Sequence, residues 1–483
     1  MQSRKSGGTH GTSSSILSSL PLTEHLRSRE HGCPMDKREF LKASGVVAAG
    51  SVLSRMLKAE LTLQAHRTNW AGNLEYSTDH LYEPASAAEV QANVKACAKI
   101  KALGARHSFN RVADSTANQI QLTHLDSMEI DEAAHTVTVG AGVKYGQLAP
   151  YLDSHGFALH NLASLPHVSV AGACATGTHG SGSKNGNLST ALFGMELVKA
   201  DGSVVSLSRK KDGAKFDGMV VALGALGVQT KVTLDLLPTF QAAQVVYQNL
   251  SFDHLEKHLD EVFGAGYSVS LFTDWQNHRA TQVWIKRKVE GGMAGGFPGE
   301  FFGAKRAMEK LHPITGHDAT PCTEQMGIPG PWYERLPHFK MAFTPSSGNE
   351  IQTEYFVPRD KGYEAILAVE QLKDRITQHL FVTELRTIAA DDLWMSMAYQ
   401  RPSMAIHFTW KPEAEAVHAV LPLIEKQLAP FDARPHWAKV FTVPPSRIQS
   451  LYPRMSEFKA LMAEYDPAGK FRNEFLDTNL FGS

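Results

Sequence analysis

The sequence predicts an α+β protein with two large lobes, and three observations support this prediction. The chain has 483 residues, far more than one hydrophobic core usually serves. Residues 69–238 combine short strands, helices and glycine-rich turns. Residues 239–440 show longer strands that alternate with helices, which is typical of a domain built on an antiparallel sheet. We expect the C-terminal segment, 441–483, to return to the first domain.

Local patterns place elements of the first domain. Ser86 and Glu89 form a capping box, and apolar residues then recur at helical spacing, so a helix is expected to follow. Leu-Gly at 103–104 is expected to end that helix. Asp-Gly at 201–202 is typical of a tight turn between two antiparallel strands.

The second domain is expected to contain long strands, helices and one irregular insertion. Pro and Gly are dense over 298–348, so this stretch is interpreted as an insertion that runs over the surface. The expected strands are 244–249, 268–274 and 282–286, and the expected helices are 253–264, 360–379 and 412–428.

Composition excludes several classes of function. Charged residues make up 20% of the chain and the net charge is −1, so there is no basic surface for nucleic acid and no electrostatic attraction to an anionic membrane. The four cysteines are scattered without a CxxC motif, which argues against a zinc site and a disulfide framework. The 22 histidines include no H-E-x-x-H, so a metal hydrolase is a remote alternative and no metal is expected.

The N-terminal region differs from the rest. Residues 1–34 are rich in Ser, Gly, Arg and His and are expected to be a disordered extension. Residues 35–68 begin with basic residues and a short apolar stretch, which resembles a twin-arginine export signal with Lys37 in place of the first arginine. We interpret them as a candidate export signal and linker, which implies a periplasmic enzyme. The alternative is an amphipathic or disordered tail of a cytoplasmic protein. No stretch is long and apolar enough to span a bilayer.

Three glycine clusters point to a bound dinucleotide. Backbone N–H groups can approach a pyrophosphate closely only where no Cβ obstructs them. The clusters lie at 103–110, 164–182 and 224–228, and each also has a plain interpretation as tight turns. None reads G-x-G-x-x-G after a first strand, so a Rossmann dehydrogenase is disfavoured.

The residues of these clusters resemble a known family. Gly-Ala-Arg-His-Ser-Phe-Asn at 104–110 resembles the first flavin-binding loop of the vanillyl-alcohol-oxidase superfamily, which has the PCMH-type FAD-binding fold. The run at 161–182, with Ala-Thr-Gly-Thr-His-Gly-Ser-Gly at its end, is similar to the second loop of alditol and xylitol oxidases. The similarity extends from Asn69 to Phe471. It implies a two-lobed PCMH-type FAD-binding domain and a substrate-binding cap domain, whose antiparallel sheet is flanked by helices.

The resemblance implies which residues hold the cofactor. His107 matches the histidine that joins covalently to the flavin 8α-methyl group. A covalent link prevents loss of the flavin and raises its redox potential, which favours oxidation of an unactivated alcohol. The implied cofactor-binding residues are Gly104, Ala105, Arg106, His107, Ser108, Ser164, Ser169, Gly172, Thr176, Gly177, Thr178, His179 and Val228.

Polar residues at strand spacing suit an uncharged polyol, which needs convergent donors and acceptors. Glu384 and Arg386 are two residues apart, so they share one face of a strand, and His407 and Thr409 repeat this spacing. On residue type alone, such pairs are usually a solvated strand face. The resemblance implies that the polyol hydroxyls are bound by Ser164, Glu384, Arg386, Thr409 and Lys439.

The resemblance implies an FAD-dependent oxidase that converts the terminal C1 hydroxyl of alditols such as xylitol and sorbitol to the aldose, with O₂ reduced to H₂O₂. Lys439, Arg386 and His407 are the expected catalytic residues. The O1 proton would leave toward Lys439 or His407, and Arg386 would stabilise developing negative charge. A monomer is expected. The alternatives are an aldonolactone oxidase or dehydrogenase of the same fold, and a sugar-binding protein that has lost its flavin.

Overall fold

The computed structural model describes residues 66–289 and 296–482. The predicted N-terminal extension, 1–34, and all but the last three residues of the predicted signal and linker, 35–68, lie outside the described residues. Among the helices of the described part, none combines the length and the apolar character that a bilayer span requires.

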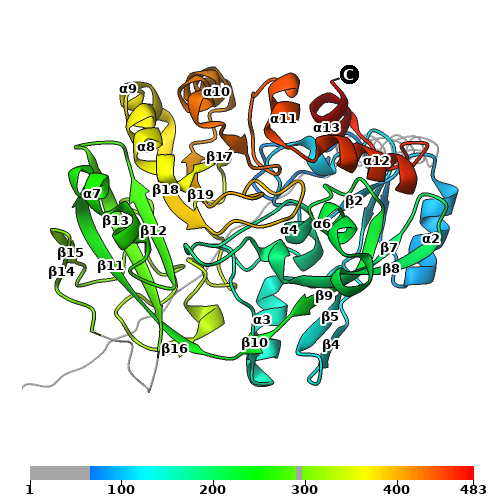
Figure 1. The fold of residues 1–483 in the computed structure, drawn as a ribbon, viewed down its shortest axis with the longest axis horizontal. Coiled ribbons are helices and arrows are strands. Elements are labelled where there is room, and N and C mark those ends of the chain that lie inside the picture. The colour runs from blue at the N-terminus through cyan, green and yellow to red at the C-terminus, as the bar shows by residue number, and fades with distance from the viewer. Residues whose placement is uncertain (1–65, 290–295, 483) are drawn as a thin grey trace, which may run out of the picture. The chain divides into compact units, whose positions relative to one another are not determined.

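The first lobe contains a three-stranded parallel sheet and a five-stranded antiparallel sheet, seen on the right in Figure 1. The small sheet has the order β1 (Leu81–Tyr82), β3 (Gln119–Gln121), β2 (Lys101–Leu103). The larger sheet has the order β4 (Met128–Asp131), β5 (Thr136–Gly140), β9 (Val228–Asp235), β7 (Leu192–Val198), β8 (Val204–Ser208). The helices of this lobe include α2 (Ala87–Ala96), α3 (Tyr145–Ser154), α4 (Val170–Ala175) and α6 (Ala214–Val220).

The Ser86 cap at the start of α2 is confirmed, but the reciprocal bond of the predicted capping box goes to the residue before the cap, and the predicted end of the helix is wrong. The Glu89 N–H donates to Ser86 Oγ at 3.2 Å, and the Glu89 carboxylate accepts from the Ala85 N–H at 2.9 Å. The helix ends at Ala96, because β2 then pairs with β3 and its backbone groups bond between strands. The hairpin predicted at 201–202 is confirmed, since Val198 and Val204 pair across it.

The second lobe is built on a ten-stranded sheet, seen on the left in Figure 1. Its main path is β14 (Glu300–Phe301), β15 (Ala304–Arg306), β11 (Gln241–Ser251), β13 (Arg279–Lys288), β12 (Ser268–Thr273), β18 (Leu380–Ile388), β19 (Ser403–Trp410), β17 (Ile351–Pro358) and β20 (Arg434–Pro435), and β16 (Gly330–Pro331) also pairs with β11. The strand pairs of this sheet are antiparallel. The predicted α+β class is therefore confirmed.

The two faces of the large sheet differ in chemistry. The helices α7 (Phe252–Phe263), α8 (Gly362–Glu370) and α10 (Ala414–Leu428) form an apolar core with the residues of one face, including Leu385 and Ile406. Successive side chains of a strand alternate between faces, so the neighbours Glu384, Arg386 and His407 lie on the opposite face. The sheet therefore presents a buried polar face away from its helices.

Two expectations for the second lobe are wrong. The helix expected at 360–379 is divided into α8 and α9 (Lys373–Ile376), because the chain leaves α8 at Gln371 and turns before α9 begins. The insertion expected over the surface at 298–348 does contain mostly turns and loops, but Trp332, His338 and Phe339 within it are buried. It packs over the sheet instead of lying on the surface.

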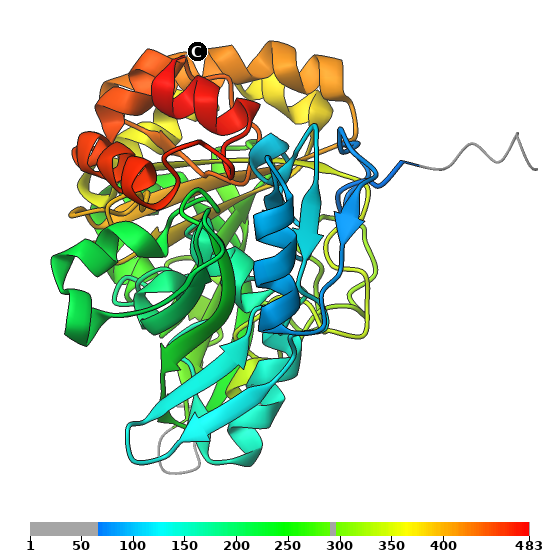
Figure 2. The ribbon, with the colours of Figure 1, turned by 90° about the vertical axis from the view of Figure 1, so that its right-hand side faces the viewer.

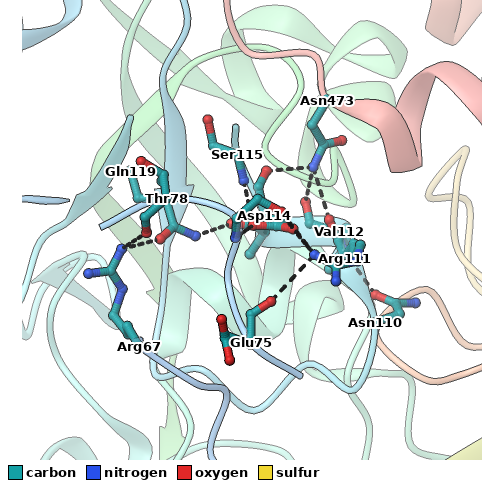
Figure 3. Close-up of polar contacts among 12 residues, drawn as sticks. Arg67, Glu75, Thr78, Asn110, Arg111, Val112, Asp114, Ser115, Gln119 and Asn473 are labelled. Atoms are coloured by element: carbon teal, nitrogen blue, oxygen red, sulfur yellow. Dashed lines mark hydrogen bonds and ion pairs between the residues drawn. The ribbon is translucent and has the colours of Figure 1, made fainter. Parts of the chain in front are cut away.

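The C-terminal helices pack on the first lobe. Phe458, Leu461 and Met462 of α12 (Met455–Tyr465) belong to the same hydrophobic cluster as the core of that lobe, and Figure 2 shows this red segment above the green and blue elements. The Asn473 side chain donates to the backbone oxygens of Arg111 and Asp114 at 2.9 and 2.8 Å (Figure 3). The end of the chain thus supports the turn that follows the first glycine cluster.

Candidate active site

One cavity of about 340 Å³ joins the glycine clusters to the polar face of the large sheet. Most of the site residues expected from the sequence line it. They are Gly104, Ala105, Arg106, His107, Ser108, Ser164, Ser169, Gly172, Thr176, Thr178, His179, Glu384, Arg386, His407, Thr409 and Lys439. Segments far apart in the chain are therefore brought to one site.

Two of the expected cofactor residues, Gly177 and Val228, are not among the lining residues. Gly177 forms a turn at φ +69°, next to the lining residue Thr176. Val228 is fully buried and pairs with Val198 at the start of β9, whereas Gly227 and Gln229 on either side of it line the cavity.

Gly104 and Gly172 pack against each other and against Ser169 in one wall of the cavity. A Cβ on Gly104 would lie 2.8 Å from Ser169 Oγ and 3.7 Å from the Gly172 Cα, and a Cβ on Gly172 would lie 2.7 Å from Ser169 Oγ. A side chain at either glycine would therefore displace Ser169. The contact brings backbone of two glycine clusters together at one wall, as a phosphate-bearing cofactor requires, and we call this glycine-lined region of the cavity the glycine slot.

His107 lies in this part of the cavity with its ring stacked on Trp70, at 4.9 Å between ring centroids. Arg106 before it has φ +63°, an unfavourable conformation for a residue with a side chain, and this conformation directs the loop at His107. Burial, and then the charges of His167 and Lys439, lower the pKa of His107 to about 3. The imidazole is therefore neutral, with a lone pair available on one nitrogen.

The loop that carries His107 is bonded directly to the segment that carries Lys439. The Phe109 N–H donates to the Ala438 oxygen at 2.7 Å. The Asn110 side chain donates to the Lys439 oxygen at 2.6 Å and to the Trp437 oxygen at 2.9 Å. Lys439 Nζ also lies 4.8 Å from the centroid of the Phe109 ring. The two segments therefore form one unit beside the cavity.

Glu384 and Arg386 are not a solvated strand face. They are 4% and 6% exposed, and Arg386 Nη2 lies 2.7 Å from Glu384 Oε2 in an ion pair. Burial alone would raise the pKa of Glu384, but the Arg386 guanidinium and His338 outweigh burial and hold that pKa below its ordinary value. The carboxylate is therefore ionised and able to accept hydrogen bonds.

Gln352 on β17 orients two of the expected catalytic residues, and sequence reasoning missed it. Its side-chain nitrogen donates to Glu350, which fixes the amide so that its oxygen faces Lys439 and His407. Lys439 Nζ donates to this oxygen, and His407 Nε2 lies 3.2 Å from it. Because an amide oxygen only accepts, His407 carries its proton on Nε2.

The ring state of His407 and the charge of Lys439 both follow from burial. Burial lowers the pKa of His407 to about 3, so the ring is neutral and Nδ1 keeps its lone pair. Burial also lowers the pKa of Lys439 to about 8, against the opposing charges of Glu354 and Glu350. The Lys439 ammonium can therefore lose its proton near neutral pH, as a general base must.

A second buried pair joins the two lobes. His179 Nδ1 donates to the Gly180 oxygen at 2.7 Å, and His179 Nε2 lies 3.0 Å from Glu354 Oε1. Because the Gly180 carbonyl only accepts, His179 Nδ1 carries a proton. The contact between His179 Nε2 and Glu354 Oε1 therefore needs a second proton, which the ring and the carboxylate share. His436 lies beside this pair, and one nitrogen or oxygen atom from each of the three side chains lies within 4.8 Å of the others, close enough to hold a metal ion. However, His436 Nδ1 accepts from the Ala438 N–H at 3.0 Å. Its other nitrogen is therefore protonated when the ring is neutral and has no lone pair for a metal.

Four buried polar atoms of the lining residues have no hydrogen-bond partner within the described residues. They are Tyr76 Oη and, on or beside the polar face of the sheet, Ser164 Oγ, Arg386 Nε and His407 Nδ1. Buried polar groups are costly when unpaired, so a ligand that brings hydroxyl groups fits this end of the cavity. The other end, with its glycine slot and neutral His107, fits a cofactor such as FAD.

Comparisons with known proteins agree with this division of the cavity. Residues 78–208 match the family described as FAD binding domain, and residues 344–479 match the family described as D-arabinono-1,4-lactone oxidase. The first match includes His107 and the glycine slot, and the second includes the polar strands and Lys439.

Three similar proteins span nearly their full length. An alditol oxidase from Streptomyces sp. is 45% identical over 420 residues, which cover 86% of this chain and 99% of that protein. L-gulonolactone oxidase from Mus musculus is 27% identical, over 85% of this chain and 97% of that protein. L-gulono-1,4-lactone dehydrogenase from Mycobacterium tuberculosis is 27% identical, over 84% of this chain and 97% of that protein.

Proposed function

Because the chain belongs to the alditol oxidase family, we propose that it oxidises the terminal C1 hydroxyl of alditols such as xylitol and sorbitol to the aldose, while O₂ is reduced to H₂O₂. The observation that carries this proposal is the single cavity, which has a glycine slot at one end and unpartnered donors and acceptors at the other. The lactone-acting relatives share the architecture at lower identity, which makes an aldonolactone reaction the weaker alternative. The proposal keeps 69–238 as the FAD-binding domain, 239–440 as the substrate domain and 441–483 as the returning segment.

FAD, when bound, supplies the two-electron chemistry: it takes a hydride from the carbinol carbon and passes the electron pair to O₂. Gly104, Ser169 and Gly172 would form part of its binding wall, because their small size lets the two glycine clusters meet beside the cavity. His107 would attach to the flavin 8α-methyl carbon. The neutral state of its ring supports this assignment, since a protonated imidazole has no free lone pair for a new bond.

The polyol would bind at the polar face of the sheet. Glu384 would accept from substrate hydroxyls, and Ser164, Arg386 and Thr409 would complete the set of partners. The unpartnered Ser164 Oγ and Arg386 Nε support this assignment. A site of this kind discriminates against analogues that lack a hydroxyl, because the unused protein groups stay buried and unpaired.

Lys439 would accept the O1 proton as the carbon is oxidised. Its pKa of about 8 matches this role better than the pKa of about 3 of His407, which binds protons too weakly. His407 would instead offer Nδ1 as a hydrogen-bond acceptor to a substrate hydroxyl, and Arg386 would stabilise negative charge on oxygen.

Two measurements test the function. Purified protein should be yellow, and after acid precipitation the colour should stay in the pellet; colour in the supernatant would exclude the covalent link. Peroxide formation should be rapid with xylitol or sorbitol and slow with gulonolactone. The reverse order of substrates would favour the aldonolactone alternative, and colourless protein would indicate a sugar-binding protein without flavin.

A further inference from the structure

Two further buried ionisable residues at the polar face have no part in the chemistry above. Lys286 lies on β13 and is 1% exposed, and His338 lies in the insertion and is 4% exposed. Lys286 Nζ lies 3.0 Å from His338 Nδ1, and His338 Nε2 lies 2.7 Å from Glu384 Oε1. The three side chains therefore form a chain of hydrogen bonds that ends on the carboxylate proposed to bind substrate.

This chain of bonds has one direction. The ionised Glu384 carboxylate can only accept, so the proton of the neutral His338 ring lies on Nε2, and His338 Nδ1 accepts from Lys286 Nζ. Burial, and then the charge of Lys286, lower the pKa of His338 to about 4, so the ring is neutral near pH 7. His338 Nε2 therefore donates to Glu384. Lys286 also donates to the backbone oxygens of Leu336 and Pro337, which hold it in place.

The backbone at His338 holds the opposite wall of the site. The N–H groups of His338 and Phe339 both donate to the Ser164 oxygen, at 2.8 and 3.1 Å. Ser164 belongs to the second glycine cluster, and its Oγ is one of the unpartnered atoms of the cavity. His338 therefore contacts a residue on each side of the site: Ser164 through its backbone and Glu384 through its ring.

We propose that His338, held by a hydrogen bond from Lys286, is a positioning residue that sets the Glu384 carboxylate and Ser164 for the polyol hydroxyls, and so determines affinity for alditols. Glu384 accepts from His338 at Oε1, and its Oε2 forms an ion pair with Arg386. With one partner on each oxygen, the carboxylate is held in place, and each oxygen keeps a lone pair for substrate. This inference rests on the proposed function.

A purely structural role is the competing explanation. The His338 ring packs against Trp284 and Phe272, at 5.0 and 5.5 Å between centroids, so its bulk alone could support the wall. Two substitutions separate the explanations. In His338→Gln the amide nitrogen can replace Nε2 and still donate to Glu384. In His338→Asn the amide oxygen can replace Nδ1 and still accept from Lys286, but the side chain is too short to reach Glu384.

The experiment is anaerobic stopped-flow reduction of the flavin by xylitol in wild type and in both variants, which gives the dissociation constant and the limiting rate separately. His338→Asn should raise the dissociation constant about tenfold or more, because a hydrogen bond to a charged group is lost. His338→Gln should stay within about threefold of wild type, and the limiting rate should change less than the affinity in both. Flavin absorbance per protein and the melting temperature serve as controls for folding.

Each result decides between the explanations. Equal affinity in the two variants, whether both are impaired or neither is, would overturn the role of His338 and leave the proposed function intact. If His338→Asn does not fold, Lys286→Met provides the same test. It removes the donor to His338 Nδ1 and should weaken xylitol binding at an unchanged limiting rate; unchanged binding would overturn the proposal. A wild-type flavin that no alditol reduces would overturn the proposed function and this inference together.

Discussion

Lys439→Met is expected to slow the oxidation of xylitol about a hundredfold or more, which is the usual contribution of a general base. The structure also predicts the pH dependence of the wild type. With a pKa of about 8, only about one Lys439 in ten is neutral at pH 7, whereas about nine in ten are neutral at pH 9. If the neutral amine takes the O1 proton, the rate of flavin reduction should therefore rise about tenfold between these values.

The assay is anaerobic reduction of the flavin at saturating xylitol from pH 6.5 to 9.5, followed at the flavin absorbance maximum. Lys439→Met should be slow and should lose the rise with pH. Lys439→Arg is the matched control, because it keeps a positive charge and a donor near Gln352 but cannot act as a base. A wild-type rate that falls above pH 8, or an arginine variant that reacts as fast as wild type, would show that Lys439 acts through its charge and not as a base.

Three further predictions concern the cofactor and the connection of the lobes. His107→Ala should release all yellow colour into the supernatant on acid precipitation. The control is His167→Ala, which removes a ring whose centroid lies 6.4 Å from that of His107 and should keep the colour in the pellet. Colour in the pellet of His107→Ala would place the covalent link at another residue. Gly172→Ala should lower the ratio of flavin to protein, because its Cβ would lie 2.7 Å from Ser169 Oγ, and adding Ser169→Ala should restore it. Gly299→Ala, which meets nothing within 4 Å, should have full flavin content, and equal content in all variants would exclude the slot as the cofactor site. Glu354→Ala should lower the free energy of unfolding in urea by about 1–3 kcal/mol, because it leaves His179 Nε2 buried without a hydrogen-bond partner. The exposed pair partner Glu457 provides the control, since Glu457→Ala should leave the urea midpoint nearly unchanged, and equal midpoints for both variants would contradict the role of the buried pair.

The sequence predicted those features that depend on neighbours in the chain. The helix cap at Ser86 and the hairpin at 201–202 need only local backbone geometry, and both are present. The helix expected at 360–379 failed because its apolar spacing continues across Gln371, where the chain turns. The insertion at 298–348 was misplaced because its composition suits a surface loop, whereas its burial depends on the sheet beneath it.

For the candidate site, the resemblance supplied the glycine loops and the polar strands, but not the residues that hold them. Gln352 and Glu354 have the same i, i+2 spacing as Glu384 and Arg386, so this signal could have found them. Lys286 and His338 gave no signal. Each is a single polar residue in its own segment, and only the register of the sheet and the path of the insertion bring them to Glu384.

The bonds between the loop of His107 and residues 437–439 have a consequence for biosynthesis. The wall of the cavity includes Ala438 and Lys439, and Asn473 secures the turn after the loop. A nascent chain that has not yet exposed residues 437–439 lacks these groups, so it cannot complete this wall around a cofactor. Flavin capture should therefore wait until this segment has left the ribosome, and chains truncated before it should stay in the apo form.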